Sequence, residues 1–516
     1  MKSKYLLLSG LGVASGMIPQ SYSMPGASDG PQLPNIIYIL ADDLGYGELG
    51  CYGQTKIETP NIDMLARSGV MFTQHYTGAP VSAPARNVLL TGLHTGNSQI
   101  RGNEEWAERG NVRDYRSMLV DSTLEGQHPM ALGTVTLAHL LNEAGYYTAL
   151  IGKWGLGAPH TESVPPKMGF DYFFGYNCQR QAHTYYPLHL YENFNRVYLN
   201  NDTVAPHTSL DQGADLYDES VYTPFNLNEY APDVMFEAMT RYINQNNPNK
   251  TGKPIFLYWA TPIPHVPLQA PQGWVDYYVE KFGDEEPYDG RFGYFPNRYP
   301  RAAYAAMVSY LDEQIGLLVK QLKEMGVYDN TLIIFTSDNG PSFSGGADSP
   351  FFDSNRPFKN EYGWSKGFLH EGGIRVPMVA SWPGKIEPGR ISHHVSAFWD
   401  VLPTFCEIAG IEPGIETDGI SFLPELLDEE QPTHEYLYWE LHEYGGQQAV
   451  RWGKWKGIRK NIFQGNREIE LYDLESDIQE QYNVAAEYPE IVHHIEQKMK
   501  DFHTPAAIKK FNFVFD

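Results

Sequence analysis

The stretch that decides the fold is "PNIIYILADD", residues 34–43. From Ile36 to Ala41 it is an unbroken apolar run rich in isoleucine. A short run without alternating polar residues predicts a strand that is buried on both faces, as in a parallel sheet. Asp42 and Asp43 follow directly. Because ligands bind beyond the carboxyl ends of parallel strands, this stretch indicates both the type of sheet and the place of a functional site.

The strand pattern recurs, and helical patterns lie between the strands. Residues 133–145 carry apolar side chains at helical spacing, with Thr134 as the expected N-cap and Gly145 after the last turn. Residues 302–326 repeat that spacing and end at Gly326. The alternation predicts an α/β fold, a large mixed, mostly parallel sheet sandwiched by helices. Further strands are expected in "YYTALIGKWG" (146–155), "PIFLYWATP" (254–262) and "TLIIFTSDNG" (331–340).

A polar segment around residue 430, "LLDEEQPTHEY", separates this pattern from a different one. The remainder predicts a smaller C-terminal α+β domain with an antiparallel sheet. We therefore expect a catalytic domain over residues 33–430 and a subdomain over 431–516. Its short strands are expected in "HEYLYWELHE" (434–443), "QAVRWGKWKGIRK" (448–460) and "IELYDLE" (469–475), and a closing helix in "PEIVHHIEQKMKDF" (489–502).

Charge and cysteine content limit the possible functions of the 516-residue chain. The formal net charge of −25 argues against nucleic acid and anionic membranes as partners, because the mean field repels them. The three cysteines supply neither a disulfide framework nor a zinc-binding spacing. The aromatic content of 14% offers stacking surfaces for sugar rings, but an aromatic-rich core accounts for it equally well.

Residues 1–23 have the order basic, apolar, small that is typical of a secretory signal peptide. The apolar part is too short to span a membrane, and no later stretch is long enough. We therefore expect export, to the periplasm of a Gram-negative bacterium.

Oxygen-bearing side chains follow two of the expected strands. Asp42 and Asp43 end the first, and Asp338 and Asn339 end the strand at 331–337. Carboxylate and amide oxygens are ligands for hard cations, so these four residues predict a Ca²⁺ site, with Mg²⁺ as the alternative. Asp42 and Asp43 alone, or Asp338 and Asn339 alone, could equally serve as N-caps of the helices that follow the strands.

Four basic residues lie just past predicted elements, in segments rich in glycine and proline. Singly, each is expected to be an ordinary surface charge. Together with a divalent cation they would form an anion pocket that stabilises a transferring phosphoryl or sulfuryl group. The four are Arg86, Lys153, His265 and Lys366.

Ser82 lies in "GAPVSAPARNVLLTG", residues 78–92. Pro84 suits the first turn of a helix, so Ser82 is expected at the helix N-terminus, where the dipole favours an anion. Arg86 follows one turn later. An unmodified serine is a weak nucleophile without a base, and no histidine has an evident triad spacing to it.

The segment "PVSAPARNVLLTG" (80–92) resembles the signature of the type I, formylglycine-dependent sulfatases of the alkaline phosphatase superfamily. In that signature Cys or Ser, any residue, Pro, a small residue and Arg lead to an apolar pair and Thr-Gly, and every constrained position matches. The resemblance extends over nearly the whole chain after the leader. It includes "ADDLGYGELGCYG" (41–53), "GKWGLG" (152–157), "PIPHVPL" (262–268), "TSDNG" (336–340) and "GWSKGFLHEGGIRVP" (363–377).

The resemblance implies a chemistry for Ser82. A maturation enzyme would oxidise it to formylglycine (3-oxoalanine), whose hydrate attacks sulfur and then expels sulfate. It also implies a calcium site made of Asp42, Asp43, Ser82, Asp338 and Asn339. The remaining roles are implied as follows: Arg86 holds the hydrate, Lys153 contacts sulfate, His265 contacts sulfate or protonates the leaving oxygen, and Lys366 is a further catalytic residue.

The chain departs from the family pattern at a few positions. Gly155 stands where many members have a histidine that contacts the formylglycine hydroxyls; His160 and His183 are candidates to replace it. Glu48 stands where aspartate is common, and we expect a structural role for it. Serine in place of cysteine implies maturation by a radical enzyme, the route typical of anaerobic bacteria.

Two polar-aromatic stretches and Arg101 are candidates for substrate binding, with hydrogen bonding between domains as an equally open alternative. The leading hypothesis is a calcium-dependent, exo-acting sulfatase on a sulfated glycan of galactose or N-acetylgalactosamine type. One alternative is a phosphomonoester or phosphodiester hydrolase of the same superfamily, and another is a sulfated-glycan binding protein that is never matured. The further candidate substrate contacts are Gln179, Arg180, His183, Glu440 and His442.

Overall fold

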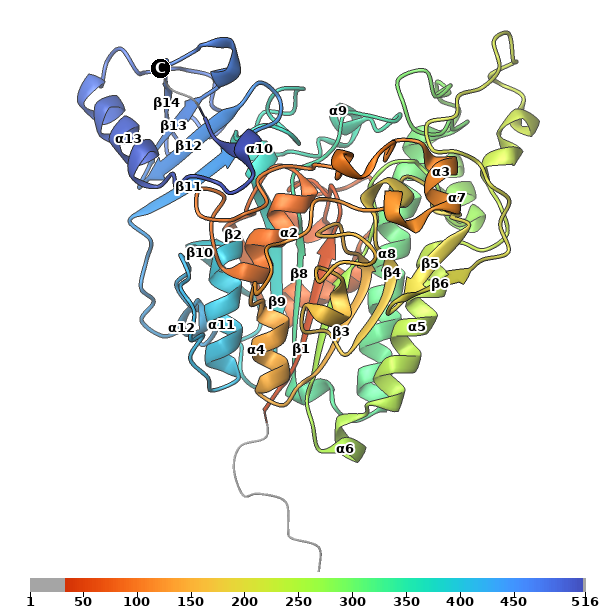
Figure 1. Ribbon diagram of the computed structural model, residues 1–516, viewed down its shortest axis with the longest axis horizontal. Helices are drawn as coiled ribbons and strands as arrows, with labels where there is room; N and C mark the ends of the chain where they lie inside the picture. The colour runs from red at the N-terminus through yellow and green to blue at the C-terminus, as the bar shows by residue number, and fades with distance from the viewer. Residues whose placement is uncertain (1–32, 514–516) are drawn as a thin grey trace, which may run out of the picture. The chain divides into compact units, whose positions relative to one another are not determined.

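A ten-stranded sheet forms the centre of the computed structural model, which describes residues 33–513 (Figure 1). The expected signal peptide, residues 1–23, lies outside the described residues. The strand order is β10-β2-β9-β8-β1-β7-β3-β4-β5-β6. The strands are β1 (Asn35–Ala41), β2 (Val70–Tyr76), β3 (Tyr147–Lys153), β4 (Tyr172–Tyr176), β5 (His189–Glu192), β6 (Asn195–Tyr198), β7 (Ile255–Ala260), β8 (Thr331–Ser337), β9 (Arg375–Ser381) and β10 (Arg390–Ala397).

The direction of the strands confirms a mixed, mostly parallel sheet. β8, β1, β7, β3 and β4 run parallel to their neighbours in the centre. β9 runs antiparallel to both β8 and β2, and β5 and β6 run antiparallel at the other edge. The carboxyl ends of β8, β1, β7 and β3 therefore lie side by side at one edge of the sheet.

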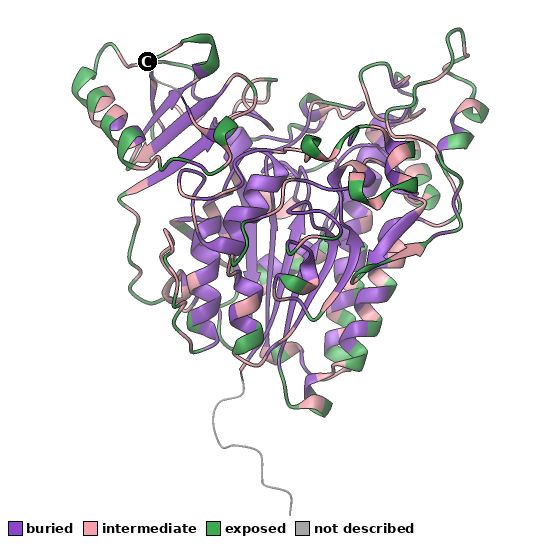
Figure 2. Ribbon diagram, in the orientation of Figure 1, coloured by how far each residue is buried: buried purple, intermediate pink, exposed green. Residues whose placement is uncertain are grey.

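Alternate residues of β1 point into two separate cores, which is why the whole strand is apolar. Ile36, Tyr38 and Leu40 pack with α2, α4 and α11 on one face. Ile37 and Ile39 pack with α1, α5 and α8 on the other face. Both cores are buried throughout (Figure 2). The longer helices are α1 (Pro60–Arg67), α2 (Ser82–Thr91), α4 (Leu137–Glu143), α5 (Ala231–Gln245), α7 (Gln272–Phe282), α8 (Pro300–Glu324) and α11 (Val401–Ile408).

A second sheet is antiparallel and has four strands in the order β11-β12-β13-β14. α13 (Pro489–Asp501) packs on one face of it. On the other face Leu437 and Trp439 of β11 join the core of the large sheet. The strands are β11 (Tyr436–Leu441), β12 (Gln447–Trp452), β13 (Trp455–Arg459) and β14 (Glu470–Asp473), and the short helices of the chain are α3 (Tyr115–Val120), α6 (Pro248–Thr251), α9 (Ser349–Phe352), α10 (Glu371–Ile374) and α12 (Leu423–Leu426).

The predicted elements are present, with two differences. The stretch 448–460, expected as one strand, forms the two antiparallel strands β12 and β13, and one helix begins at a different residue. The N-cap of α4 is Thr136, not Thr134, because its hydroxyl and the His139 side chain satisfy each other's backbone N–H groups. Residues from Leu33 onward form one compact unit, and the division at residues 430 and 431 stays a prediction. Within residues 33–513 no helix is both long and apolar enough to cross a membrane.

A buried ion network joins the two sheets. Lys456 of β13 donates to Glu371 of α10 at 2.8 Å and lies 3.0 Å from Glu480. The Tyr76 hydroxyl donates to Glu371 at 2.7 Å, and Arg375 lies 3.2 Å from the same carboxylate. Burial raises the pKa of Glu371, but Lys456 and the neighbouring arginines outweigh it and hold that pKa at about 2. The carboxylate is therefore charged and depends on its cations.

We predict that Lys456→Ala lowers the free energy of unfolding by about 3–5 kcal/mol, because it leaves buried carboxylates without their shared cation. Urea denaturation of the whole chain measures this. Lys454→Ala is the matched control: Lys454 pairs with Asp473 at 2.6 Å, but its side chain is 39% exposed, so its removal leaves stability nearly unchanged. Equal losses in both variants would contradict the structural role given to the buried network.

Candidate active site

The carboxyl ends of four neighbouring strands bring the predicted site residues together. Asp42 and Asp43 follow β1, and Asp338 and Asn339 follow β8. Lys153 ends β3, and His265 lies in the turn after β7. Figure 1 shows the start of α2 above this edge of the sheet. The segments on which the sequence analysis relied therefore converge on one place.

Ser82 is the first residue of α2 and is fully buried. Its Oγ donates a hydrogen bond to Asp42 Oδ1 at 3.0 Å. Lys153 Nζ donates to Asp42 Oδ2 at 2.6 Å and lies 3.5 Å from Ser82 Oγ. Ser82 thus lies between a carboxylate, to which it donates, and an ammonium group at a helix N-terminus. The ammonium group and the helix dipole favour negative charge on its side chain, and the carboxylate opposes it.

Arg86 connects the acidic residues of two strands. Its guanidinium donates to Asp338 Oδ2 at 2.9 Å and to the Lys153 carbonyl at 2.9 Å, and it lies 3.6 Å from Asp42 Oδ2. All of these groups are buried. Arg86 therefore fixes the ends of β3 and β8 relative to each other.

Asp43 is the centre of the other half of the site. Its Oδ2 accepts from Lys366 Nζ at 2.6 Å and lies 3.7 Å from His265 Nε2. Its Oδ1 accepts from Asn339 Nδ2 at 2.8 Å, and its backbone N–H donates to Asp338 Oδ1 at 3.1 Å. The φ angle of 66° places Asp43 in the left-handed region, which turns its carboxylate back toward the strand ends.

The electrostatic environment of the site is set by burial and by paired charges. Burial raises the pKa of Asp42, but Lys153 and the other cations outweigh it, so the pKa lies below its ordinary value. Burial raises the pKa of Asp338 to about 6. Burial lowers the pKa of His265 to about 4, so the ring is neutral at pH 7 in this arrangement. Each buried carboxylate in the site is thus held by a cationic side chain.

The donor atoms suit a hard cation. Ligand atoms of Asp42, Asp43 and His265 all lie within 4.8 Å of one another. Asn339 Oδ1 is buried and, among the described residues, has no hydrogen-bond partner. An amide oxygen without a partner beside three carboxylates fits oxygen coordination of calcium or magnesium. The structure therefore brings the predicted ligand residues together, with His265 beside them.

The structure shows what occupies the space beside Gly155. A Cβ at this position, where φ is +73°, would lie 2.7 Å from Gln179 Nε2. That Nε2 atom is buried and has no partner among the described residues. His183 stacks on His265 with ring centroids 5.4 Å apart, whereas His160 is exposed and bonds to Ser122. Of the predicted replacements, only His183 reaches the predicted site residues.

The other candidate substrate contacts are engaged with protein groups. Arg101 donates to Glu440 Oε1 at 2.6 Å, and both side chains are fully buried. His442 stacks on Phe513, and Arg180 pairs with Glu105 at 2.7 Å. Their binding of substrate stays a prediction. Glu48 accepts from the Tyr304 hydroxyl and the Gly45 N–H at 2.7 and 2.8 Å, which holds the loop after β1 as expected.

Sequence reasoning missed two residues of this region. The hydroxyl of Tyr258 in β7 is buried without a hydrogen bond to a described residue, and Arg86 opposes the rise in pKa that burial gives the phenol. Thr77 Oγ1 donates to the Asp338 carbonyl at 2.5 Å. The polar hydroxyl of Tyr258 within an otherwise apolar predicted strand could have identified it as a candidate site residue. Nothing in the sequence around Thr77 distinguishes it from an ordinary loop residue.

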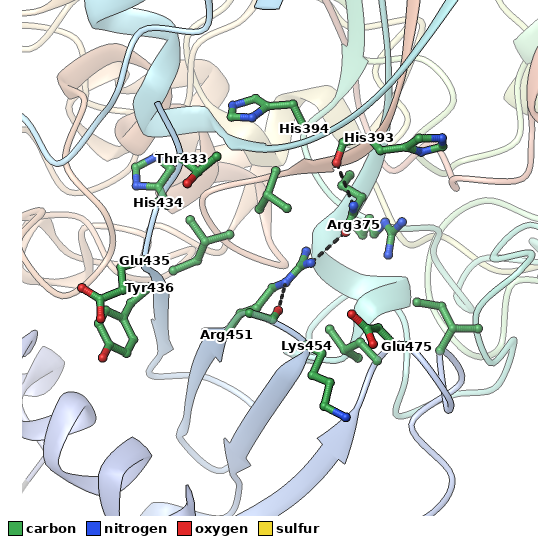
Figure 3. Close-up of a pocket in the computed structure, with 16 residues that line it drawn as sticks. Arg375, His393, His394, Thr433, His434, Glu435, Tyr436, Arg451, Lys454 and Glu475 are labelled. Atoms are coloured by element: carbon green, nitrogen blue, oxygen red, sulfur yellow. Dashed lines mark hydrogen bonds between the residues drawn. The ribbon is translucent and has the colours of Figure 1, made fainter. Parts of the chain in front are cut away.

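A separate cavity of about 480 Å³ lies between the β2–β10 edge of the large sheet and the small sheet (Figure 3). None of the predicted site residues lines it. Its Arg451 donates to the Tyr76 hydroxyl, to Gln74 Oε1 and to the Gly453 carbonyl at 2.6, 2.7 and 3.1 Å. Protein groups therefore occupy the Arg451 guanidinium. Because Arg451 belongs to β12 and two of its partners belong to β2, we infer that it joins the small sheet to the large one.

A serine at a helix N-terminus, an oxygen-rich ligand cluster and flanking cations define a hydrolase of anionic esters on an alkaline-phosphatase-like fold. A sulfatase family model matches residues 34–411, and a model of the C-terminal part of N-sulphoglucosamine sulphohydrolase matches residues 360–504. The chain belongs to the sulfatase family and is a sulfuric ester hydrolase.

Individual relatives agree with this assignment. Arylsulfatase A from Homo sapiens is 30% identical over 503 residues, which cover 90% of this chain and 86% of that protein. N-acetylgalactosamine-6-sulfatase from Homo sapiens is 29% identical over 464 residues, covering 85% and 75%. The crystal structure of Ps i-CgsB in complex with k-i-k-neocarrahexaose has a TM-score of 0.72 at 27% identity, covering 94% of this chain and 95% of that chain.

We predict that Lys366→Ala or His265→Ala lowers kcat for sulfate esters by roughly 10²–10³-fold, as removal of one preorganised charge stabiliser does. Steady-state kinetics with 4-nitrophenyl sulfate measures the loss. Lys385→Ala is the control, because Lys385 is exposed and outside the site. A loss of less than about threefold in either site variant would place that side chain outside the catalytic machinery.

Proposed function

We propose that the protein removes sulfate from sulfated carbohydrates, using a formylglycine made from Ser82 and one bound calcium ion. The observation that carries the proposal is the position of Ser82 Oγ, 3.0 Å from Asp42 Oδ1 and 3.5 Å from Lys153 Nζ. Formylglycine would supply a hydrated aldehyde as nucleophile and a route for sulfate release that a serine ester lacks. The sequence around Ser82 carries the family's signature, which supports this conversion.

The calcium ligands would be Asp42, Asp43, Asp338 and Asn339, together with the modified Ser82. Bound there, the ion would supply positive charge to an oxygen of the sulfate ester. Lys153 and Lys366 now bond to Asp42 and Asp43 at 2.6 Å each. A cation that takes those carboxylates leaves both ammonium groups free to bind an anion, so metal binding and sulfate binding support each other.

His265 is placed to exchange a proton with the leaving group. Its Nδ1 lies 2.5 Å from the Val266 carbonyl, which can only accept, so Nδ1 carries a proton. Nε2 is then the atom that faces Asp43, at 3.7 Å, and the site. Nε2 is therefore the atom that would contact sulfate. In the neutral ring Nε2 carries no proton, so it would hand one to the sugar oxygen only after taking up a proton itself, which the charge of a bound sulfate ester would favour.

The names of the relatives support a galacto-configured sugar. One relative is an N-acetylgalactosamine-6-sulfatase, and the similar solved structure contains a neocarrahexaose. We propose an exo-acting enzyme on sulfated galactose or N-acetylgalactosamine, exported and matured by a formylglycine-generating enzyme. Phosphate ester hydrolysis is the competing activity. Within residues 33–513 one cluster, rich in oxygen atoms and with one histidine, could hold a metal, which favours one hard ion over a pair of zinc ions.

We predict that protein co-expressed with a maturation enzyme yields a Ser82 peptide lighter by two hydrogens and releases sulfate from sulfated galactose or N-acetylgalactosamine. Mass spectrometry and sulfate release across a panel of positionally defined monosaccharides measure both. Ser82→Ala should show neither the mass change nor turnover. Faster turnover of 4-nitrophenyl phosphate than of the sulfate would favour the phosphatase instead, and binding without turnover by protein whose Ser82 is unmodified would favour a binding protein.

We predict that calcium raises the melting temperature of chelator-treated protein by roughly 3 °C or more at saturation, because it binds only the folded state. Asn339→Ala should abolish most of the shift, since it removes the amide oxygen that now has no partner. Asn360→Ala is the matched control: its Oδ1 also lacks a described partner, but its amide bonds to the Ser349 carbonyl, away from the acids. No shift with calcium or magnesium in the unaltered protein would argue against the ion.

A further inference from the structure

Three bulky residues hold a left-handed backbone, and two of them adjoin the candidate active site. Of the described residues other than glycine with positive φ, most are Asp, Asn or His, which tolerate this region. The exceptions are Tyr294 (φ 65°), Tyr444 (φ 50°) and Glu480 (φ 53°). Glu480 belongs to the buried ion network. A strained tyrosine persists only where its surroundings hold it, and such residues cluster at ligand-binding sites.

Tyr444 covers the backbone next to Lys366. It lies in the turn between β11 and β12, and Gly445 and Gly446 follow it with φ of 89° and 79°. A Cβ on Gly367 would lie 2.6 Å from Tyr444 Cζ, so only a glycine fits beneath the ring. The ring is 5.4 Å from that of Phe368, yet Tyr444 remains 44% exposed. The small sheet thus places an open aromatic face beside Lys366.

Tyr294 approaches the site from a different loop, the one that precedes α8. Its ring centroid is 5.8 Å from His265 and 5.1 Å from His183. Its backbone N–H donates to His207 Nδ1 at 2.9 Å, which holds the strained turn in place. The phenol therefore stands against the histidine that faces Asp43.

Lys366 acts on the pKa of both phenols, and Tyr444 acts on that of Tyr294. Burial raises the pKa of Tyr294 to about 12. Lys366 opposes this rise, and Tyr444 adds to it. Burial also raises the pKa of Tyr444, and Lys366 again opposes the rise. Neither hydroxyl has a hydrogen-bond partner among residues 33–513. The Tyr444 ring lies over Gly367, which follows Lys366 in the chain, and the Tyr294 ring lies against His265, which shares Asp43 with Lys366.

We propose that Tyr294 and Tyr444 are the specificity-determining walls that bind the pyranose ring of a sulfated sugar whose sulfate lies at Lys366. The inference rests on the proposed function and adds the residues that select a sugar. Aromatic rings stack on the C–H faces of a pyranose, and the phenols supply hydrogen bonds to its hydroxyl groups. A galacto-configured ring suits this wall, because its axial hydroxyl leaves one face with a continuous patch of C–H groups.

The test separates sugar recognition from the reaction at sulfur. In matured protein, the double variant Tyr294→Phe with Tyr444→Phe should lower kcat/KM for the best sulfated monosaccharide of the panel roughly tenfold, because two hydrogen bonds are lost. Turnover of 4-nitrophenyl sulfate, which has no sugar hydroxyls, should change less than about twofold. Tyr482→Phe is the matched control, since Tyr482 is 70% exposed on the same C-terminal part.

A binding measurement makes the test independent of maturation. In the Ser82→Ala background, calorimetry should show roughly tenfold weaker binding of that sugar when Tyr444 is changed to Asn. Asn tolerates the left-handed backbone, so the melting temperature should fall by less than about 2 °C. A merely structural tyrosine would give the opposite result, a lower melting temperature and unchanged affinity.

The outcomes are distinguishable from those of the proposed function. Unchanged sugar kinetics and affinity in these variants would overturn the tyrosine proposal while leaving the sulfatase proposal intact. The tyrosine proposal would also be overturned, and the sulfatase proposal left intact, if the unaltered protein hydrolyses 4-nitrophenyl sulfate but binds no sulfated galactose or N-acetylgalactosamine. Failure of matured, unaltered protein to release sulfate from any ester would overturn the proposed function itself.

Discussion

The candidate active site depends on the pairing of opposite charges that the sheet buries at its carboxyl edge. Lys153 with Asp42, Arg86 with Asp338 and Lys366 with Asp43 are all in contact at 2.6–2.9 Å. A buried carboxylate without such a partner would be costly, so the three pairs hold the strand ends in one arrangement. The same pairs explain how one site can take a divalent cation and an anion together. On the proposed function, a cation at the carboxylates would take the place of the ammonium groups, which would then be free to bind sulfate.

Much of the fold follows from the apolar runs of the central strands. Ile36 to Ala41 are buried on both faces, as an unbroken apolar run requires, and the acids after β1 and β8 meet because the two strands are parallel neighbours. The outer strands were not anticipated. β2 carries Thr73, Gln74 and His75, so its apolar pattern is broken, and its partners β9 and β10 lie more than 300 residues away in the sequence.

The finer parts of the site could not be predicted because they depend on contacts between distant segments. Gln179 fills the space beside Gly155 only because β3 and β4 are adjacent, a relation that no local pattern records. Tyr444 lies over Gly367, next to Lys366 in the chain, only because the small sheet packs against α10. The Lys456–Glu371 pair, at 2.8 Å, fixes that packing, which connects the stability of the small sheet to the geometry of the sugar-binding walls.

The central claim is that the paired charges at the carboxyl edge form a single site for a hard cation and a sulfate group. A crystal structure of the matured protein with calcium and a sulfated monosaccharide tests it most directly. We expect sulfate oxygens within about 3 Å of Lys153 Nζ and Lys366 Nζ, with the cation on Asp42, Asp43, Asp338, Asn339 and the residue made from Ser82. Sulfate bound elsewhere, for instance among the arginines of the cavity in Figure 3, with both lysines still paired to their carboxylates, would contradict it.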